Sequence, residues 1–338
     1  MNRLLVVRLG SLGDLVHTLP AVAAIRQAHP ALEIDWLVDI VHQDFLSLTP
    51  VVTSIVALPD RTARGWWQVR PVLAARAYDV AADFQGLIKS AALARLSGAA
   101  RVLGFDKESL REPAAGFFYT EQVDVRGVGH VIAKNLRLAA ALGASAGGTR
   151  SFPLTTVESA ALADVRSRVG GPFALLNPGA AWPNKRWPAE RFGQLAGHLR
   201  SRHALRSVVL WGPGEAGLAE EVVGHAGGAA LAAPPTTLSD LVAFARGARL
   251  MVSGDTGPLH IAAAVGLPVV ALFGPTDPAR NGPWADDDIS LARYGGCECH
   301  YERRCRQEAA WCLRTISLDD VAEAVDRRLA AAEPGDRP

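Results

Sequence analysis

A short polar loop in the second half of the sequence carries residues suited to a phosphorylated ligand. The stretch SGDTGPLH (253–260) sets three such residues, Thr256, Gly257 and His260, directly after Asp255, between an apolar run and a predicted helix. The N-terminus of a helix exposes unpaired N–H groups and the positive end of the helix dipole, and both attract anions. Asp255 and Thr256 would equally serve as helix caps. This stretch alone therefore leaves an anion site and a cap as alternatives.

Two further loops have the same character. In NPGAAWPNKRWP (177–188), Asn177 and Gly179 follow an apolar run, and the ammonium group of Lys185 suits a phosphate. In WGPGEAG (211–217), Glu215 stands at a predicted helix start, where its carboxylate can accept the hydroxyls of a ribose or cap the helix. The alternative for the first loop is a solvated turn over packed tryptophans.

The three loops together favour nucleotide binding more than any of them does alone, because ligands of open parallel sheets bind beyond the carboxyl ends of the strands. The sequence contains neither G-x-G-x-x-G nor G-x-x-x-x-G-K-[ST]. Their absence weighs against a dehydrogenase and against a P-loop enzyme.

The N-terminal stretch VVRLGSLGDLVHTLP offers one carboxylate at a similar position. Gly10 and Gly13 allow a tight turn, and Asp14 falls at the start of the following helix. Asp14 is interpreted either as a helix cap, which is the commoner role, or as a general base.

These loops are positioned by apolar runs that alternate with helical patterns, which predicts an α/β protein with parallel sheets. The predicted strands are 3–9, 33–39, 54–58, 78–84, 101–105, 172–177, 207–211, 248–253 and 269–273. The clearest predicted helices are 15–27, 130–144, 189–202, 216–226, 258–266 and 317–332. The pattern restarts after a polar, less regular stretch near 145–171, so two domains joined by a linker are expected.

The amino-acid composition limits the classes of protein to which this chain can belong. The 338 residues are 49% hydrophobic and 20% charged, as in a globular chain. A net charge of +1 argues against a nucleic-acid partner, which needs a concentrated basic surface. No signal peptide is visible, and glycines and prolines interrupt the longest uncharged tract, Thr256–Thr276. A cytoplasmic location is expected.

All four cysteines fall near the C-terminus, at Cys297, Cys299, Cys305 and Cys312. In a cytosolic chain such clustering indicates metal binding or packed thiols rather than disulfides. The spacing C-x-C-x5-C-x6-C matches no common zinc pattern, so reduced thiols are favoured over a metal site.

Several long motifs make the chain resemble the lipopolysaccharide heptosyltransferases of glycosyltransferase family 9, and among them heptosyltransferase I. The motifs run in order along the chain: RLGSLGDLVHTLP, YDVAADFQGLIKSAALARL, REPAAGFFY, NPGAAWPNKRWP, SGDTGPLHIAAAVG and FGPTDPARNGPW. The resemblance implies a GT-B fold, in which two Rossmann-like domains face one another across a cleft. It places an acceptor-binding domain at 1–165, a nucleotide-sugar-binding domain at 166–316, and a C-terminal helix and tail at 317–338.

The resemblance also implies an activity: inverting transfer of heptose from ADP-heptose to Kdo of the lipopolysaccharide inner core, without a required metal or other cofactor. Asp14 would be the base, Lys185 would bind the diphosphate, Glu215 the ribose and Asp255 the heptose. Thr256, Gly257 and His260 would lie at the phosphates. Positions 180 and 181 are both alanine, whereas the family's first-heptose enzymes carry threonines there, so only backbone N–H groups of these positions are available.

The implied acceptor, Kdo–lipid A, is anionic. The expected acceptor-binding residues are Ser11, Arg61, Arg64, Lys89 and Arg111, with Trp66 and Trp67 positioned to dip into lipid headgroups. The alternative is a solvated surface of arginines with packed tryptophans. A peripheral contact with the cytoplasmic face of the inner membrane is therefore expected.

One further motif could suggest another function. The run DDD at 286–288 contains the D-x-D metal signature of other glycosyltransferases, but it is predicted to be a solvated loop after the last strand. The alternatives to heptose transfer are a family-9 enzyme with another nucleotide sugar or acceptor, and a non-catalytic nucleotide-sugar-binding protein.

Overall fold

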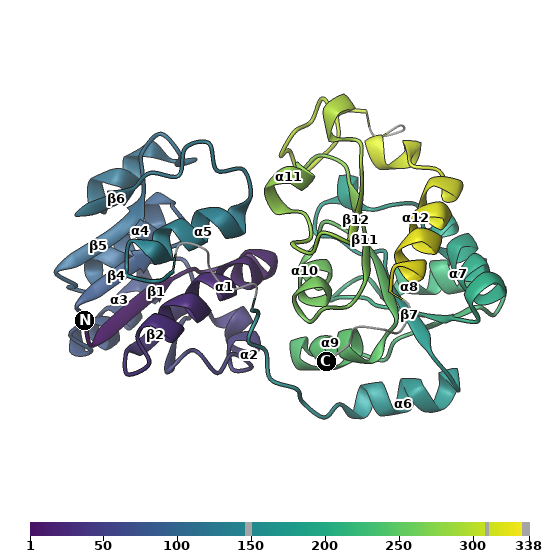
Figure 1. Ribbon diagram of the computed structural model, residues 1–338, viewed down its shortest axis with the longest axis horizontal. Coiled ribbons are helices and arrows are strands. Elements are labelled where there is room, and N and C mark those ends of the chain that lie inside the picture. Colours follow the sequence, from purple (N-terminus) through teal and green to yellow (C-terminus); the bar gives the residue numbers. More distant parts are fainter. Residues whose placement is uncertain (146–150, 308–310, 333–338) are drawn as a thin grey trace. The chain divides into compact units, whose positions relative to one another are not determined.

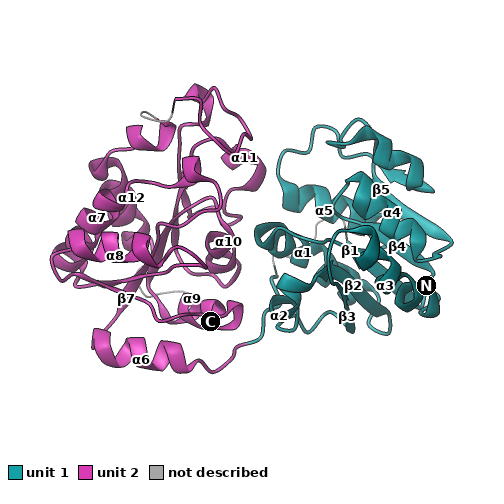
Figure 2. Cartoon of the chain, turned by 180° about the vertical axis from the view of Figure 1, so that it is seen from behind, with its two compact units in different colours: residues 1–155 teal, residues 156–338 magenta. Residues whose placement is uncertain are grey.

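The computed structural model describes residues 1–145, 151–307 and 311–332. These residues form two compact units, 1–155 and 156–338, which Figure 2 colours separately. Residues 146–150 of the expected linker and 333–338 of the expected tail lie outside the described residues. That the two sheets face one another across a cleft stays a prediction.

Unit 1 is a six-stranded parallel sheet with flanking helices, in the strand order β3-β2-β1-β4-β5-β6 (Figure 1). Its elements are β1 (Arg3–Val7), α1 (Leu12–Ala28), β2 (Glu33–Asp39), η1 (Ile40–His42), α2 (Gln43–Leu46), β3 (Ser54–Leu58), α3 (Ala63–Ala75), β4 (Val80–Asp83), α4 (Ile88–Leu96), β5 (Arg101–Phe105), η2 (Pro113–Phe118), β6 (Glu121–Val123) and α5 (Val131–Ala140). After Arg3, the central strand β1 is apolar and buried throughout, as expected for a strand covered on both faces.

Unit 2 repeats the plan, with the strand order β12-β11-β10-β7-β8-β9. Its elements are α6 (Ala160–Val169), β7 (Phe173–Asn177), η3 (Pro183–Lys185), α7 (Ala189–His203), β8 (Arg206–Val209), α8 (Ala216–His225), β9 (Ala230–Ala232), α9 (Leu238–Gly247), β10 (Leu250–Gly254), α10 (Gly257–Ala264), β11 (Val269–Phe273), α11 (Pro278–Asn281), β12 (Ile289–Ala292), η4 (Tyr294–Gly296), η6 (Cys312–Thr315) and α12 (Leu318–Ala330). The prediction of an α/β fold with two Rossmann-like domains is confirmed.

The division between the units falls ten residues before the expected boundary at 165/166. The backbone N–H of Thr155 donates to Leu48 O at 2.8 Å, which ties this residue to unit 1. The Ser159 hydroxyl donates to Asp240 at 2.7 Å and caps α6, a helix inside the stretch expected to be an irregular linker. Because α6 packs against α9, it belongs to unit 2.

The C-terminal helix α12 is part of unit 2 rather than a separate appendage. Val321, Ala324 and Val325 are buried in the same apolar cluster as Phe192 and Leu199 of α7. A capping box between Ser317 and Asp320 starts the helix.

The prediction that residues 286–288 form a solvated loop after the last strand is wrong for Asp288. The strand β12 follows it, and the Asp288 side chain is 2% exposed. Its carboxylate accepts hydrogen bonds from Arg328 Nε and from the Val269 N–H, both at 3.0 Å. Asp288 therefore holds α12 against the sheet.

No helix among the described residues combines the length and the apolar composition that crossing a bilayer requires.

Candidate active site

The strand order of unit 2 brings two of the predicted loops together. Strands β7 and β10 are adjacent, and Ser253 pairs with Asn177. The two strands flank the topological switch point of the sheet, where the strand order reverses. The Asn177 amide donates to Ser253 Oγ at 2.9 Å and to Thr256 Oγ1 at 3.0 Å. Asn177 and Thr256 thus meet at the carboxyl ends of their strands, where parallel sheets bind ligands.

Asp255 is the centre of this site. Its side chain is 4% exposed, and Lys185 Nζ lies 2.6 Å from Asp255 Oδ2. His260, on the first turn of α10, contacts Asp255 Oδ1 through Nε2 at 3.1 Å. One buried carboxylate therefore orients both the lysine and the histidine that the sequence predicts for anion binding.

The charge state of Asp255 follows from these contacts. Burial alone would raise its pKa, but the hydrogen bond from His260 and the charge of Lys185 outweigh burial. The pKa of Asp255 is held far below its usual range, so the carboxylate stays ionised.

Two hydrogen-bond donors to Asp255 were not predicted from the sequence. Thr276 Oγ1 donates to Asp255 Oδ2 at 2.6 Å, and Asn281 Nδ2 donates to the same oxygen at 3.2 Å. Both lie in FGPTDPARNGPW, directly after β11, which neighbours β10. The rule that polar residues after adjacent parallel strands converge is the signal that would have found them.

The N-terminus of α10 is not capped by a side chain. Thr256 is the N-cap residue, but its hydroxyl bonds to Ser253 and Asn177 instead of the helix amides. The Asp255 carboxylate is likewise committed to Lys185 and His260. The sequence left an anion site and a helix cap as alternatives for this loop, and the side-chain cap is not formed.

Glu215 pairs with a residue that the sequence analysis did not name. It is the N-cap residue of α8 without a side-chain cap bond, and Arg186 Nη2 lies 3.2 Å from its Oε1. The same guanidinium donates to Ala180 O at 2.7 Å. A Cβ at Gly179 would lie 2.1 Å from Glu215 Oε2, so any larger residue at this position would have to displace the Glu215 carboxylate.

In unit 1, Asp14 lies on the first turn of α1 and is held at both oxygens. Asp14 Oδ2 accepts the Ser11 N–H at 3.1 Å and the Ser11 hydroxyl at 2.9 Å. Asp14 Oδ1 lies 2.5 Å from Arg8 Nη2, and 30% of its side chain is exposed. The capping role is thus present, and the carboxylate is also fixed by a buried arginine that the sequence analysis did not consider.

The glycine turn before α1 is held by the side chain of Gln85 and lies close to His42. The Gln85 amide oxygen accepts the Leu9 N–H at 2.8 Å. A Cβ at Gly10 would meet His42 Nε2 at 2.9 Å. Arg61 lies near this turn and pairs through Nε with Asp39 Oδ2 at 2.8 Å.

The other expected acceptor residues lie at the surface of unit 1. Arg64, Lys89 and Arg111 are exposed, on or next to α3, α4 and η2. Because α4 packs against both α3 and η2, these residues lie on neighbouring elements.

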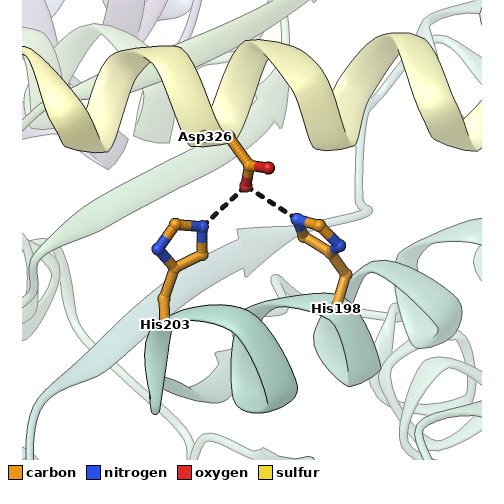
Figure 3. A group of neighbouring side chains, drawn as sticks. All are labelled: His198, His203 and Asp326. Carbon is orange, nitrogen blue, oxygen red and sulfur yellow. Dashed lines mark hydrogen bonds and ion pairs between the residues drawn. The ribbon is translucent and has the colours of Figure 1, made fainter.

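One group of side chains among the described residues has the composition and spacing of a metal site. His198 and His203 of α7 both contact Asp326 Oδ1 of α12 through Nε2, at 2.7 and 2.6 Å (Figure 3). The group lies toward the C-terminal end of α7, whereas the Lys185 loop precedes the N-terminus of that helix.

Two Rossmann-like domains, with polar loops converging at the strand ends of the second, give the chain the GT-B fold of nucleotide-sugar glycosyltransferases. The family model of glycosyltransferase family 9 (heptosyltransferase) matches residues 66–310. The chain belongs to this family.

Relatives and solved structures agree with this assignment. The chain is 29% identical to lipopolysaccharide heptosyltransferase 1 of Pseudomonas aeruginosa, over 98% of this chain and 99% of the relative. The structure of the E. coli heptosyltransferase WaaC with ADP is similar, with 27% identity, a TM-score of 0.75 and coverage of 98% and 99%. The same enzyme with ADP-2-deoxy-2-fluoro heptose gives 26% identity, a TM-score of 0.74 and coverage of 96% and 99%.

Proposed function

We propose that this enzyme transfers heptose from ADP-L-glycero-D-manno-heptose to Kdo of the lipopolysaccharide inner core, with inversion at the anomeric carbon. The observation that carries the proposal is the Lys185–Asp255 pair beside the uncapped N-terminus of α10. It supports a diphosphate site in a chain whose relatives are named heptosyltransferase 1.

The donor is proposed to bind unit 2 at the carboxyl ends of β7 and β10. Lys185 is held in place by Asp255, so its ammonium group loses little freedom when it meets a phosphate. The amides of α10 add donors and the positive end of the helix dipole. Glu215 would accept ribose hydroxyls, after exchanging part of its contact with Arg186.

Inverting transfer needs one base for the acceptor hydroxyl. Asp14 fits this role because it is ionisable, partly exposed and fixed in direction by Ser11 and Arg8. ADP departs as an anion, so Lys185 and the α10 amides would stabilise the charge that develops on it. No second carboxylic acid is needed to protonate the leaving group, in contrast to a glycosidase.

The exposed surface of α3, α4 and η2 is proposed to meet the anionic acceptor and the cytoplasmic face of the inner membrane. Trp67 is 70% exposed and Phe117 is 91% exposed, beside Arg64, Lys89 and Arg111. Aromatic side chains among basic residues suit an anionic lipid interface. Cosedimentation with phosphatidylglycerol vesicles should fall for Trp67→Ser. Equal vesicle binding by that variant and the unchanged protein would contradict the proposed role of this surface.

The activity is tested with a panel of donors. Release of ADP from ADP-heptose with a Kdo-terminated acceptor is compared with turnover of UDP- and GDP-sugars. We expect turnover with ADP-heptose alone. Turnover with another nucleotide sugar would establish a different family-9 activity, and binding of ADP-heptose without any turnover would indicate a non-catalytic binder.

A further inference from the structure

The side chains of His198, His203 and Asp326 meet between two helices of unit 2, away from the residues of the proposed reaction. Both histidines lie on α7 and the aspartate lies on α12 (Figure 3). His198 Nε2 is 2.7 Å from Asp326 Oδ1, and His203 Nε2 is 2.6 Å from the same oxygen. The three atoms all lie within 4.8 Å of one another, which is close enough for them to share one metal ion.

We propose that His198, His203 and Asp326 bind one divalent transition-metal ion, and that zinc is the ion they suit best. Imidazole nitrogen and carboxylate oxygen are both ordinary zinc ligands. Zinc bonds of about 2.0–2.1 Å in a tetrahedron place neighbouring ligand atoms about 3.4 Å apart. Each Nε2 therefore moves about 0.7 Å away from Asp326 Oδ1 when the ion binds, a shift that small rotations about the side-chain bonds supply.

The protons and charges of the three side chains balance when the ion enters. The Asp326 carboxylate only accepts hydrogen bonds, so without an ion each histidine ring carries a proton on Nε2. With the ion bound, each neutral ring carries its proton on Nδ1 and presents the lone pair of Nε2 to the metal. Asp326 supplies one negative charge, because an aspartate is ionised at neutral pH.

The fold holds the ligands in position before an ion arrives. Helix α12 packs against α7. Leu199, next to His198, and Val325, next to Asp326, are buried in the same apolar cluster. Because core residues fix the backbone on both sides of the group, the ion finds its ligands already assembled and little chain entropy is lost on binding.

The group is accessible to ions from solvent. The side chains of His198, His203 and Asp326 are 28%, 21% and 37% exposed. Three protein ligands leave a fourth position of the tetrahedron for water.

The ion has a structural task and takes no part in transfer. Helix α7 rises about 1.5 Å per residue, so His203 lies about 20 Å along the axis from the end of α7 that follows the Lys185 loop. The ion would join α7 to Asp326, which is 123 and 128 positions away from the two histidines. It binds the folded chain in preference to the unfolded one and thereby stabilises the attachment of α12.

The test is titration of Zn²⁺ into the full-length protein at neutral pH, followed by isothermal titration calorimetry. We expect about one ion per chain at this site. His203→Gln and Asp326→Asn should each lose that ion. The amide that replaces the ring in His203→Gln still offers an N–H to Asp326, so the contact between the helices is kept while the zinc ligand is removed.

Two controls separate this site from other zinc ligands of the chain. His225→Gln, at an exposed histidine of α8 in the same unit, should bind zinc as the unchanged protein does. Cys299→Ser is needed because the four cysteines are free thiols and sulfur also binds zinc. Cys299→Ser should keep the ion that His203→Gln loses.

A second measurement does not depend on the folding of a variant. The first equivalent of Co²⁺ added to the unchanged protein should give the visible absorption of nitrogen and oxygen ligation, without the strong sulfur-to-cobalt charge-transfer band of a thiolate site. Absence of zinc binding, equal zinc binding by His203→Gln and the unchanged protein, or a sulfur charge-transfer band from the first equivalent of Co²⁺ would each overturn the proposal. Neither measurement requires transferase activity, so both are independent of the proposed function.

Discussion

Lys185 and Asp255 show at the scale of single residues what the sequence contains and what it omits. From their loops, Lys185 could be assigned to a phosphate and Asp255 to a ligand contact or a helix cap, because polar residues after buried strands signal ligand contact. The contact between them could not be predicted, because 70 positions separate the two residues and only the strand order brings them together. The same holds for Arg8 beside Asp14 and Arg186 beside Glu215.

Replacing Lys185 tests the diphosphate site. Lys185→Met keeps the length of the side chain but removes the charge, so we expect the dissociation constant of ADP to rise about 10- to 100-fold. Isothermal titration calorimetry measures this constant. Lys107→Met, at an exposed lysine of unit 1, is the control and should bind ADP as before. If Lys185→Met loses stability but keeps its ADP affinity, the lysine serves only to neutralise Asp255.

Asp255 makes the stability of the protein depend on pH. Its pKa is lowered on folding, so its contribution is fully present above the pKa of an unfolded aspartate, about 4, and is lost as the pH falls below that value. Urea unfolding from pH 7 to pH 3 should show this loss.

Asp255→Asn should be less stable at pH 7 by about 3 kcal/mol, because it leaves Lys185 without its buried partner. It should also lose less stability in acid than the unchanged protein. Asp287→Asn removes an exposed carboxylate of the same unit and should leave both properties unchanged. If Asp255→Asn and the unchanged protein lose the same stability between pH 7 and pH 3, the Asp255 carboxylate is not the source of the pH dependence.

At the scale of elements, most of the apolar strands were predicted, whereas three of the four edge strands and the helix α9 were not. The strands β2, β3, β5 and β11 match their predicted ranges. The edge strands β6 and β12 are only partly buried and carry weak patterns, and β9 has three residues. The helix α9 had a usable signal, since Thr237 and Asp240 form a capping box before its apolar face.

The buried pair Arg328–Asp288 fastens α12 to the sheet and allows a double-mutant test. Arg328→Met leaves the Asp288 charge buried without its partner, which should cost about 3–5 kcal/mol of unfolding free energy. Adding Asp288→Leu removes that charge and should recover most of the loss.

The matched control for this cycle is Arg327→Met, the exposed neighbour on the same helix, which should change stability by less than about 0.5 kcal/mol. Denaturant unfolding measures all four proteins. Equal losses for Arg327→Met and Arg328→Met would mean that net charge, and not the buried pair, governs the attachment of α12.

At the scale of the whole molecule, the restart of the strand–helix pattern predicted two α/β domains, and the family resemblance implied that both are Rossmann-like. The two six-stranded parallel sheets confirm both predictions. The division of labour remains a proposal. In it, unit 2 holds the nucleotide sugar and unit 1 supplies Asp14. Transfer would then belong to neither unit alone.

The most direct test of this division is turnover of ADP-heptose with a Kdo-terminated acceptor by Asp14→Asn, measured together with its ADP affinity. Asparagine keeps the size of the side chain but cannot take the acceptor proton, so kcat should fall at least about 100-fold. The dissociation constant of ADP should stay within a few-fold, because the proposal assigns the donor to unit 2. Undiminished turnover, or a parallel loss of ADP binding, would contradict the assignment of Asp14 as the base.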